Sequence, residues 1–331
     1  MYDILFDFSS SPTGGGFRRL EAYAEYFSQS TLKIHFFIHT AASNRDRIQQ
    51  LVPTTLVHKT NASKVWLIKD YLKKIGMGAK WLFSYGIPIK RGYAEQNWLH
   101  VSNVLPFFFF HVTVAPNIFL KMCLLRQQFK SNYLNNDIIS AESDFSIKMY
   151  IDVTGWKGDA IVLRNGLHKV DPGFEPKQPF AIAIGTHPYK RIDRTYEVFQ
   201  ELKDELGLNK LLIVGDSKLI PRVIRSAVDV ESKDYLPEAE LLSCLKRAMY
   251  FISTSEVENS SSAVLEGLQY TQKAILSNIP SHQEMLRSNS GKHFQHLGKD
   301  YLIVNQNDVS DGAMAEWPNE IEKMLLRMGF I

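Results

Sequence analysis

The amino-acid sequence predicts an α/β protein with two doubly wound domains, and three observations support this prediction. The chain has 331 residues, which is a length suited to two domains. Short apolar strands alternate with amphipathic helices, most regularly in the second half. A turn-rich segment near 165–178, within NGLHKVDPGFEPKQP, separates one alternating region from the other.

The first half opens with a strand, a glycine loop, a helix and a second strand. After the glycines, apolar residues from Phe17 to Phe27 recur every three or four positions, as one buried helix face requires. Elements in this order begin a βαβ unit. The strands of this half are predicted at 2–8, 32–40 and 97–103, and the helices at 17–29 and 64–83.

The second half alternates more regularly, which predicts a parallel sheet covered by helices. We expect a first domain over 1–165, a second over 166–310, and a C-terminal helix over 311–331 that packs back on the first domain. The strands are predicted at 180–185, 210–216, 250–255 and 273–278, and the helices at 194–207, 237–248 and 262–270.

Composition excludes several other classes of protein. Hydrophobic residues make up 45% of the chain and charged residues 22%, which excludes a disordered or fibrous protein. The two cysteines, Cys123 and Cys244, form neither a disulfide scaffold nor a zinc-binding pair, so a reducing compartment is expected. The N-terminus lacks a basic signal-peptide region, and the longest apolar run is too short to span a membrane. We therefore expect a cytoplasmic protein that contacts a membrane only peripherally.

The net charge of +3 conceals a difference between the two halves. Residues 1–165 contain 19 Lys and Arg against 12 Asp and Glu, an excess of +7. Residues 166–331 contain 19 Lys and Arg against 23 Asp and Glu, a net charge of −4. A basic first half and an acidic second half indicate different partners for the two domains.

Glycines open the first predicted helix at Gly14, Gly15 and Gly16. Glycine lets a ligand approach the backbone closely, and a helix start offers unpaired N–H groups and the positive end of the helix dipole. A diphosphate or a sugar phosphate suits such a site. A bare turn after a strand is the alternative, because GGG matches neither the dinucleotide pattern nor the Walker pattern.

Lys190 and Arg191 follow the first strand of the second domain, within GTHPYKRID. Ligands of open α/β sheets bind where the strands end, so these side chains are placed to neutralise the phosphates of a nucleotide. A basic turn exposed to solvent is the alternative.

Two glutamates, Glu258 and Glu266, lie eight residues apart across a strand-end loop and a helix. Glu266 stands in the apolar sequence AVLEGL, so it needs a hydrogen-bonding partner where it is buried. Hydroxyl pairs of a sugar are good donors to a carboxylate. The spacing by itself is common by chance.

In this order and context, the motifs resemble those of the retaining glycosyltransferases of the GT-B fold, family 4. The donor-site signature of that family is a glutamate, seven residues and a second glutamate, as in Glu258 and Glu266. GTHPYKRID is similar to its phosphate-binding lysine turn, and SNIPSHQEML (277–286) to its segment after the next strand. VLRNGLH, SPTGGGFRRLEAYA and NDIISAESDFS resemble its interdomain turn, its glycine loop and a late strand of its first domain.

The resemblance covers nearly the whole chain and is most specific over 180–286. It implies two Rossmann-like domains facing across a cleft. It is strongest to bacterial enzymes that assemble O-antigen or similar surface polysaccharides. The implied activity is transfer of a sugar from a nucleoside-diphosphate sugar, with UDP expected because it is commonest in the family.

The resemblance also implies a role for each matched residue. Glu266 would hold the donor ribose, Glu258 the transferred sugar and Lys190 the leaving diphosphate. His100 is the best match to a first-domain residue that faces the sugar, so Glu258, Lys190 and His100 are the candidate catalytic residues. The other candidate donor-binding residues are Gly15, Gly16, Arg191, Gly215, Asp216, Tyr235, Asn259 and Ser260.

The chain departs from the family pattern at two places. Gly185 stands where the family usually has an arginine, five residues before the lysine, and we expect Arg191 or His187 to supply that charge. Asn-Ser-Ser-Ser replaces the usual glycine-rich loop after Glu258, which alters the expected contacts with the sugar.

The implied mechanism follows from the charges. A departing nucleoside diphosphate leaves negative charge on its β-phosphate, which a lysine, a helix N-terminus and glycine amides would stabilise. No carboxylate is placed as a nucleophile, so the family's route is a same-face attack that retains the anomeric configuration. No Asp-x-Asp motif is present. We therefore expect neither a metal ion nor another cofactor.

The predicted helix over 64–83 is basic on one side, at Lys69, Lys73, Lys74 and Lys80. Such a surface favours anionic lipid headgroups and a lipid-diphosphate-linked oligosaccharide acceptor, which would place the protein on the inner face of a bacterial membrane. An ordinary surface helix with solvated lysines is the alternative. Nucleic acid is not expected as a partner, because no recognised nucleic-acid-binding motif is present.

Two other functions remain open. A sugar-nucleotide epimerase has the same two-domain fold, although its chemistry needs acid and base side chains gathered in the cleft. A non-catalytic GT-B subunit that binds sugar or lipid is the second alternative, and the altered serine loop and the missing arginine keep it open.

Overall fold

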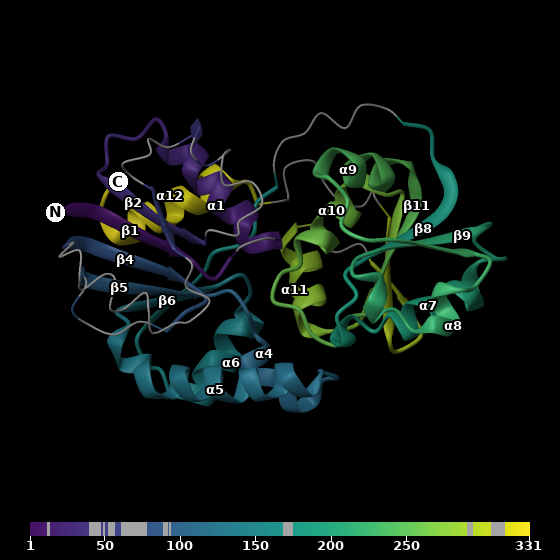
Figure 1. Cartoon of the computed structure of the whole chain (residues 1–331), viewed down its shortest axis with the longest axis horizontal. Helices are drawn as coiled ribbons and strands as arrows, with labels where there is room; N and C mark the ends of the chain where they lie inside the picture. The colour runs from purple at the N-terminus through teal and green to yellow at the C-terminus, as the bar shows by residue number, and fades with distance from the viewer. Residues whose placement is uncertain are drawn as a thin grey trace. The chain divides into compact units, whose positions relative to one another are not determined.

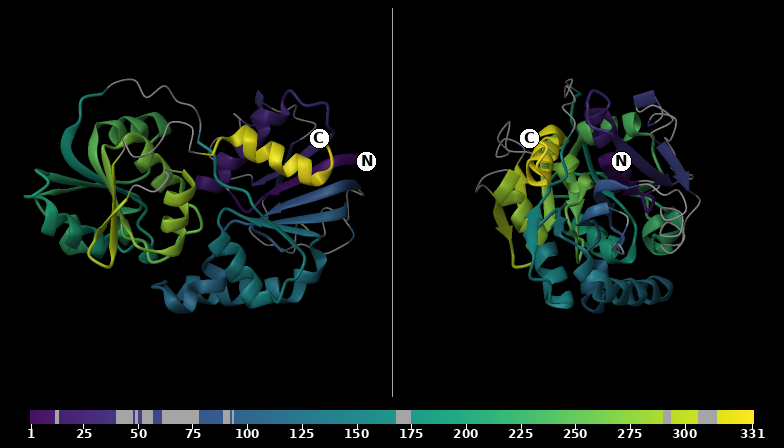
Figure 2. Two further views of the ribbon diagram at one scale, coloured as in Figure 1. Left: turned by 180° about the vertical axis from the view of Figure 1, so that it is seen from behind. Right: turned by 90° about the vertical axis from the view of Figure 1, so that its left-hand side faces the viewer.

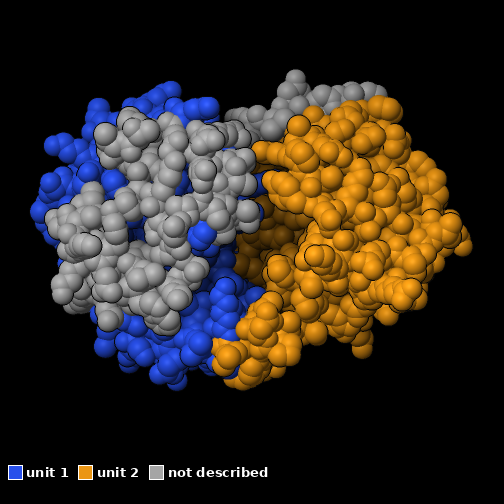
Figure 3. All heavy atoms as spheres, viewed as in Figure 1, with its two compact units in different colours: residues 1–107, 121–166, 315–331 blue, residues 108–120, 167–314 orange. Residues whose placement is uncertain are grey.

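The computed structural model describes the chain in several stretches. They are residues 1–11, 14–39, 48, 50–51, 57–60, 78–88, 92, 94–167, 175–289, 294–305 and 315–331. The chain is divided into two compact units (Figure 3). Unit 1 contains Met1–Phe107, Lys121–Gly166 and Ala315–Ile331, and unit 2 contains Phe108–Leu120 and Leu167–Met314.

Unit 1 is built on a sheet in which the described strands are all parallel, in the order β3-β2-β1-β4-β5-β6-β7. The predicted strand at 2–8 is confirmed with the same ends, and those at 32–40 and 97–103 are confirmed with shifted ends. The strands are β1 (Tyr2–Phe8), β2 (Ile34–His39), β3 (Val57–Thr60), β4 (Ala79–Tyr85), β5 (Ala94–Val101), β6 (Ile138–Ala141) and β7 (Asp159–Val162).

Helices cover both faces of this sheet (Figures 1 and 2). α1 and α12 pack on one face, and α5 and α6 pack on the other. The helices outside 167–314 are α1 (Gly14–Phe27), α4 (Leu105–Phe108), η2 (Phe109–His111), α5 (Pro116–Asn132), η3 (Tyr133–Asn135), α6 (Asp144–Thr154) and α12 (Trp317–Met328).

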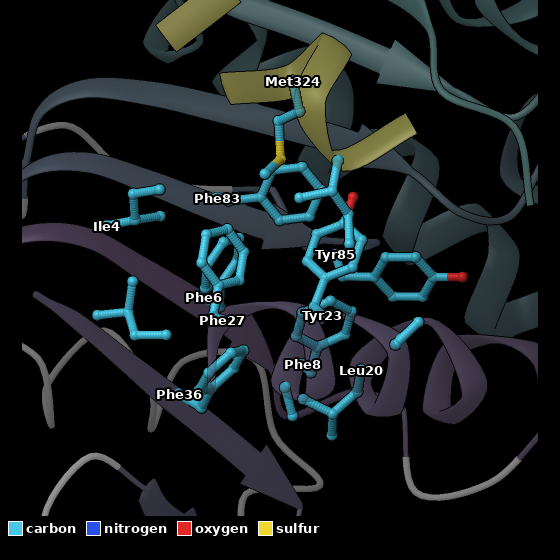
Figure 4. Packing of buried hydrophobic residues seen from close by; sticks show 14 of the residues in the cluster. Ile4, Phe6, Phe8, Leu20, Tyr23, Phe27, Phe36, Phe83, Tyr85 and Met324 are labelled. Atoms are coloured by element: carbon cyan, nitrogen blue, oxygen red, sulfur yellow. The ribbon is translucent and has the colours of Figure 1, made fainter. Parts of the chain in front are cut away.

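Aromatic rings fill the core between the sheet, α1 and α12 (Figure 4). The ring of Phe6 stacks on Phe36 with centroids 5.1 Å apart and meets the edge of Tyr23 at 5.5 Å. Met324 of α12 enters the same cluster. The C-terminal helix is therefore part of the core of unit 1, although most of that unit precedes residue 167 in the chain.

The end of the predicted helix over 64–83 is wrong, because Ala79–Tyr85 form β4, which pairs with β1 and β5. A central parallel strand is covered on both faces, so most of its side chains are apolar and it lacks the two-residue period that distinguishes a strand. Lys80 is 54% exposed and forms an ion pair with Asp3 at 3.0 Å. Lys69, Lys73 and Lys74 lie outside the described residues.

Unit 2 has a second seven-stranded sheet in its described residues, in the order β10-β9-β8-β11-β12-β14-β13. The four predicted strands are confirmed as β8, β9, β11 and β12, which run parallel. β13 and β14 are antiparallel additions at one edge. The strands are β8 (Gln178–Ile184), β9 (Lys210–Val214), β10 (Val230–Lys233), β11 (Ala248–Ser253), β12 (Lys273–Ser277), β13 (Gln295–Leu297) and β14 (Tyr301–Asn305).

Helices also cover both faces of the second sheet. α9, α10 and α11 pack on one face, and α7 and α8 pack on the other (Figure 1). The helices within 167–314 are η4 (Pro188–Lys190), α7 (Ile192–Leu202), η5 (Ser217–Leu219), α8 (Arg222–Arg225), α9 (Glu238–Arg247), α10 (Ser262–Tyr270) and α11 (Pro280–Asn289). Each domain is thus a Rossmann-like, doubly wound α/β unit.

The segment that follows β7 at the end of unit 1 is held by α1 and α12, the two helices on one face of the first sheet. The buried Arg19 of α1 donates hydrogen bonds to the carbonyls of Leu163 and Arg164, at 3.0 and 3.1 Å. Glu320 of α12 accepts one from the Arg164 amide at 2.8 Å. A Cβ on Gly166 would lie 2.4 Å from the backbone nitrogen of Trp317, so only glycine fits.

No helix among the described residues combines the length and the apolar character needed to cross a membrane.

The substitution Gly267→Ala tests the packing of α10 on β11. Alanine favours a helix over glycine by about 1 kcal/mol, but its Cβ would lie 2.3 Å from the Phe251 ring. We expect the free energy of unfolding to fall by roughly 1 to 3 kcal/mol because overpacking exceeds the gain in helix propensity. Urea unfolding measures this change. In a Phe251→Leu background the cost of Gly267→Ala should shrink, and an undiminished cost would contradict the explanation.

Candidate functional site

Most of the predicted site residues follow strands of unit 2 that end at one edge of its sheet. β8, β9, β11 and β12 are parallel, so their carboxyl ends share that edge, which is where ligands bind in open α/β sheets. Lys190 and Arg191 follow β8, Gly215 and Asp216 follow β9, and Glu258, Asn259 and Ser260 follow β11.

Lys190 and Glu258 form an ion pair at this edge. The Lys190 Nζ contacts Glu258 Oε1, and the two side chains are only 14% and 9% exposed. Ser255 donates a second hydrogen bond to the same oxygen, at 2.7 Å. Because β8 and β11 are neighbours, the structure brings together two residues that are 68 positions apart in the chain. The ammonium group and the carboxylate are thus held side by side in a largely buried site.

Gly185 lies directly beneath this lysine. Its φ is +93°, and a Cβ there would lie 3.2 Å from Lys190 Cε. A side chain at this position would strain the backbone and displace the lysine. Glycine therefore suits the backbone and the packing at this position, where the resembling family has an arginine.

Neither expected replacement for that arginine carries a free positive charge. Arg191 forms ion pairs with Asp193 and Glu256, each at 2.6 Å, and these carboxylates raise its pKa. Arg191 adopts a φ of +54°, and its carbonyl accepts a hydrogen bond from Thr254 at 2.8 Å. Arg191 therefore anchors the start of α7. Burial lowers the pKa of His187, which favours its neutral form.

Glu266 lies inside α10 and is 8% exposed. Asn259 and Ser260 are half-buried in the loop between β11 and this helix. The loop carries Glu258 at one end, and α10 carries Glu266 one to two turns after its start at Ser262. The two glutamates therefore lie on successive elements, a strand-end loop and the helix that follows it.

The candidate residues after β9 and β10 lie in the loops that follow these strands. Gly215 has a φ of +152°, and a Cβ there would lie 2.9 Å from the Thr186 side chain. Asp216 accepts a hydrogen bond from the Lys218 amide at 3.0 Å and begins η5. Tyr235 follows β10 and is 75% exposed. The structure thus places these three residues on two neighbouring strand-end loops.

His282 of α11 is a residue of this edge that sequence analysis did not single out. Its Nδ1 donates to the Ser277 carbonyl at 2.9 Å, because a carbonyl only accepts. Ser277 Oγ in turn donates to the Ser255 carbonyl at 2.6 Å, and Ser255 bonds Glu258. Burial lowers the pKa of His282, so it is held neutral. A hydrogen-bonded path thus connects α11 to Glu258. The histidine within SNIPSHQEML, just past a strand end, was the available signal.

His100, which we matched to a first-domain residue that faces the sugar, is placed in the interior of unit 1. The side chain is completely buried at the end of β5, with its ring stacked on Tyr85 at 5.1 Å. Its Nδ1 is 2.8 Å from Ser140 Oγ, and its Nε2 is 3.2 Å from Glu142 Oε1. Burial lowers the pKa of His100 well below its usual value, so the ring is neutral. We therefore assign it to a buried polar network.

Glu142 is the second residue that sequence analysis missed. It follows β6 and is 4% exposed. Tyr85 donates a hydrogen bond to its Oε1 at 3.3 Å, and the Arg19 guanidinium is 3.9 Å away. Burial raises the pKa of Glu142 to about 8, against the effect of Arg19. A glutamate directly after the buried run IISA was the signal that could have identified it.

Gly15 and Gly16 lie in the first turn of α1. A Cβ on Gly16 would lie 2.5 Å from Ser11 Oγ and 2.7 Å from the Tyr85 ring. Close packing of α1 on the ends of β1 and β4 is therefore sufficient to require glycine at position 16.

Among the residues that the structure describes, no three His, Cys, Asp or Glu side chains are grouped as metal ligands.

Comparison with known proteins gives matches in structure alone. No protein-family model and no curated protein matches the sequence. Sucrose-phosphate synthase from Thermosynechococcus elongatus aligns with a TM-score of 0.60 at 11% identity, over 100% of this chain and 91% of that one. AviGT4, a glycosyltransferase involved in avilamycin A biosynthesis, aligns with a TM-score of 0.59 at 12% identity, over 99% of this chain and 97% of that one.

A longer protein aligns over part of its length. A point mutant of S. aureus TarM, in complex with UDP among other ligands, has a TM-score of 0.52 at 15% identity, over 80% of this chain and 55% of that one. With two Rossmann-like domains and these neighbours, the chain has the GT-B fold.

The substitution Glu142→Gln tests the buried network of unit 1. Folding raises the pKa of Glu142 from 4.5 to about 8, so the native state keeps a proton that the unfolded chain loses. This contribution to stability is complete below pH 4.5 and is lost as the pH rises to about 8. In Glu142→Gln we expect a smaller fall in the free energy of unfolding across this range, measured by urea unfolding. Glu25→Gln, which removes an exposed carboxylate, is the control. Equal pH slopes for Glu142→Gln and wild type would contradict the prediction.

Variants of His282 test the path to Glu258. His282→Phe keeps a ring but removes the donor to the Ser277 carbonyl, so the free energy of unfolding should fall by about 1 to 3 kcal/mol. His282→Asn retains a donor near Nδ1 and should lose less. Thermal and urea unfolding compare the two with His296→Phe, an exposed control. Equal losses in Phe and Asn variants would show that the hydrogen bond is unimportant.

Proposed function

We propose that this protein is a glycosyltransferase that moves a sugar from a nucleoside-diphosphate sugar to an acceptor. The observation that carries the proposal is the Lys190–Glu258 pair at the carboxyl edge of β8 and β11. The GT-B fold supports it, because the structural neighbours include a sucrose-phosphate synthase and a glycosyltransferase.

The pair combines the two chemical groups that the reaction requires. Lys190 supplies a cation for the diphosphate, whose negative charge increases as the bond to the sugar breaks. Glu258 supplies an acceptor for sugar hydroxyl groups. Its contacts with Lys190 and Ser255, as far as the described residues extend, both use Oε1. Oε2 is the atom that we assign to a sugar hydroxyl.

The remaining roles follow from position and from the family resemblance. Glu266 binds the ribose hydroxyls from α10, while Asn259 and Ser260 lie beside the sugar. Gly215, Asp216 and Tyr235 contact the base, and Gly15 and Gly16 contribute from the first domain. The UDP in the TarM complex favours a UDP-sugar as donor. The anomeric configuration is retained, and the reaction needs no metal ion.

The acceptor that we propose is an oligosaccharide linked to a lipid diphosphate, in bacterial O-antigen or surface polysaccharide synthesis. The support is the resemblance of the motifs and the excess of +7 in the first half, which favours anionic partners at the inner face of the membrane.

The test is a donor assay with UDP-sugars and GDP-sugars, in which release of the nucleoside diphosphate is measured with a lipid-linked acceptor. Lys190→Met and Glu258→Gln should lower kcat by roughly 100-fold or more, as loss of a group that stabilises transition-state charge does. The matched controls are Lys210→Met and Glu231→Gln, which remove the members of an exposed ion pair of 2.8 Å in the same unit. Thermal unfolding verifies that each variant is folded.

Other results would contradict the proposal. Interconversion of the sugar nucleotide without an acceptor would indicate an epimerase. Donor binding without turnover, for all nucleotides and acceptors tried, would indicate a non-catalytic binding subunit. Normal turnover in Lys190→Met would remove the lysine from the mechanism.

A further inference from the structure

Helix α5 carries apolar side chains on the face that points away from the core. Met122 and Phe129 are buried, whereas Leu120 is 63% exposed and Leu124 is 58% exposed. With 3.6 residues per turn, Leu120 and Leu124 lie one turn apart, on the side of the helix opposite Met122 and Phe129. A surface helix ordinarily carries polar residues on that side. α5 is therefore apolar on two opposite faces.

Aromatic rings extend this outer face at the start of the helix. Phe119 precedes Leu120 and is 39% exposed. Phe110, which is 60% exposed, packs on Phe119 with the rings edge to face and the centroids 5.7 Å apart. We call Phe110, Phe119, Leu120 and Leu124 the α5 surface. Exposed apolar groups gathered in this way mark an interaction site.

The segment that carries the α5 surface contains basic residues and no acidic ones. The sequence contains no Asp or Glu from 96 to 136. Lys121 and Lys130 are exposed on α5, and Arg126 is half-exposed between them. In a chain with 35 acidic residues, such a stretch concentrates positive charge beside the apolar side chains. The partner of this surface therefore needs an apolar interior and an anionic boundary.

We propose that the α5 surface docks on an anionic lipid bilayer. The leucine and phenylalanine side chains enter the boundary between headgroups and acyl chains, and the lysines contact the headgroups. A second copy of this chain is a poorer occupant, because self-association through α5 would bring Lys121 and Lys130 of two molecules together. The proposal rests on the membrane location in the proposed function and deepens it by naming the surface that docks, and its test needs no nucleotide sugar. Figure 1 shows α5 along the lower side of the first sheet.

The experiment is cosedimentation with two kinds of vesicle. Neutral vesicles contain phosphatidylcholine alone, and in anionic vesicles part of it is replaced by phosphatidylglycerol. Wild type should bind the anionic vesicles and lose binding as salt increases. Leu120→Glu with Leu124→Glu should weaken that binding by roughly tenfold or more, because two apolar side chains no longer enter the bilayer. The charge-matched control is Val223→Glu with Leu326→Glu, at sites that are 76% and 65% exposed. This control should bind as wild type does.

A second pair of variants tests the charge. Lys121→Gln with Lys130→Gln should weaken binding to the anionic vesicles by roughly tenfold and flatten its salt dependence. Lys157→Gln with Lys299→Gln removes two exposed lysines elsewhere and should have little effect. In Phe119→Trp, brominated lipids should quench the added fluorescence, which reports insertion at the α5 surface itself. Circular dichroism and thermal unfolding verify that the variants are folded.

Several results would overturn the proposal. They are no binding of wild type to anionic vesicles, equal binding to both kinds of vesicle, or unchanged binding in Leu120→Glu with Leu124→Glu. Loss of binding in Lys73→Glu with Lys74→Glu, but not in the α5 variants, would place docking at 64–83. A dimer that the α5 variants dissociate, without vesicle binding, would assign the surface to a second copy. Turnover of the donor is a separate measurement, so either proposal can fail alone.

Discussion

Burial of the parallel strands on both faces is the constraint on which the rest of this structure depends. Helices cover each sheet from two sides, so a charged side chain in mid-strand would lose its hydration without compensation. Charged and hydrogen-bonding groups therefore collect where strands end. In unit 2 that edge carries Lys190 and Glu258, and in unit 1 it carries His100 and Glu142.

Local compensation of charge is the second feature that both edges share. Arg191 is held by two carboxylates, and Lys190 by one. In unit 1, Arg19 is surrounded by oxygen acceptors, while burial raises the pKa of the adjacent Glu142 and favours its protonated form. A charge with its own fixed partners anchors structure. Lys190 differs from Arg191 because, within the described part of the chain, it pairs with a single carboxylate, and this difference is why we propose Lys190 as the partner of a diphosphate.

Sequence patterns predicted the repeated strand–helix units well, because each buried strand is a short apolar run and each helix has one apolar face. They failed at 79–83, where a central strand is covered on both faces and its apolar side chains do not alternate with polar ones. They also failed for β13 and β14, which are an antiparallel addition to a parallel sheet. For the site, the spacing of Glu258 and Glu266 was visible in the sequence, but His282 and Glu142 were not identified, because their partners are distant in the chain.

Local patterns in the chain were sufficient for the α/β class, the order of the main elements in the second half and the loops that carry the candidate residues, since these depend on periodicity and on turn-forming residues. The partners of the charged side chains are decided by the tertiary structure alone. In the folded chain Lys190 pairs with Glu258, Arg191 pairs with Asp193 and Glu256, and His100 is buried. It also left Leu120 and Leu124 exposed on a helix whose sequence does not distinguish its two faces. Burial and pairing depend on neighbours brought together by strand order, which no local pattern specifies.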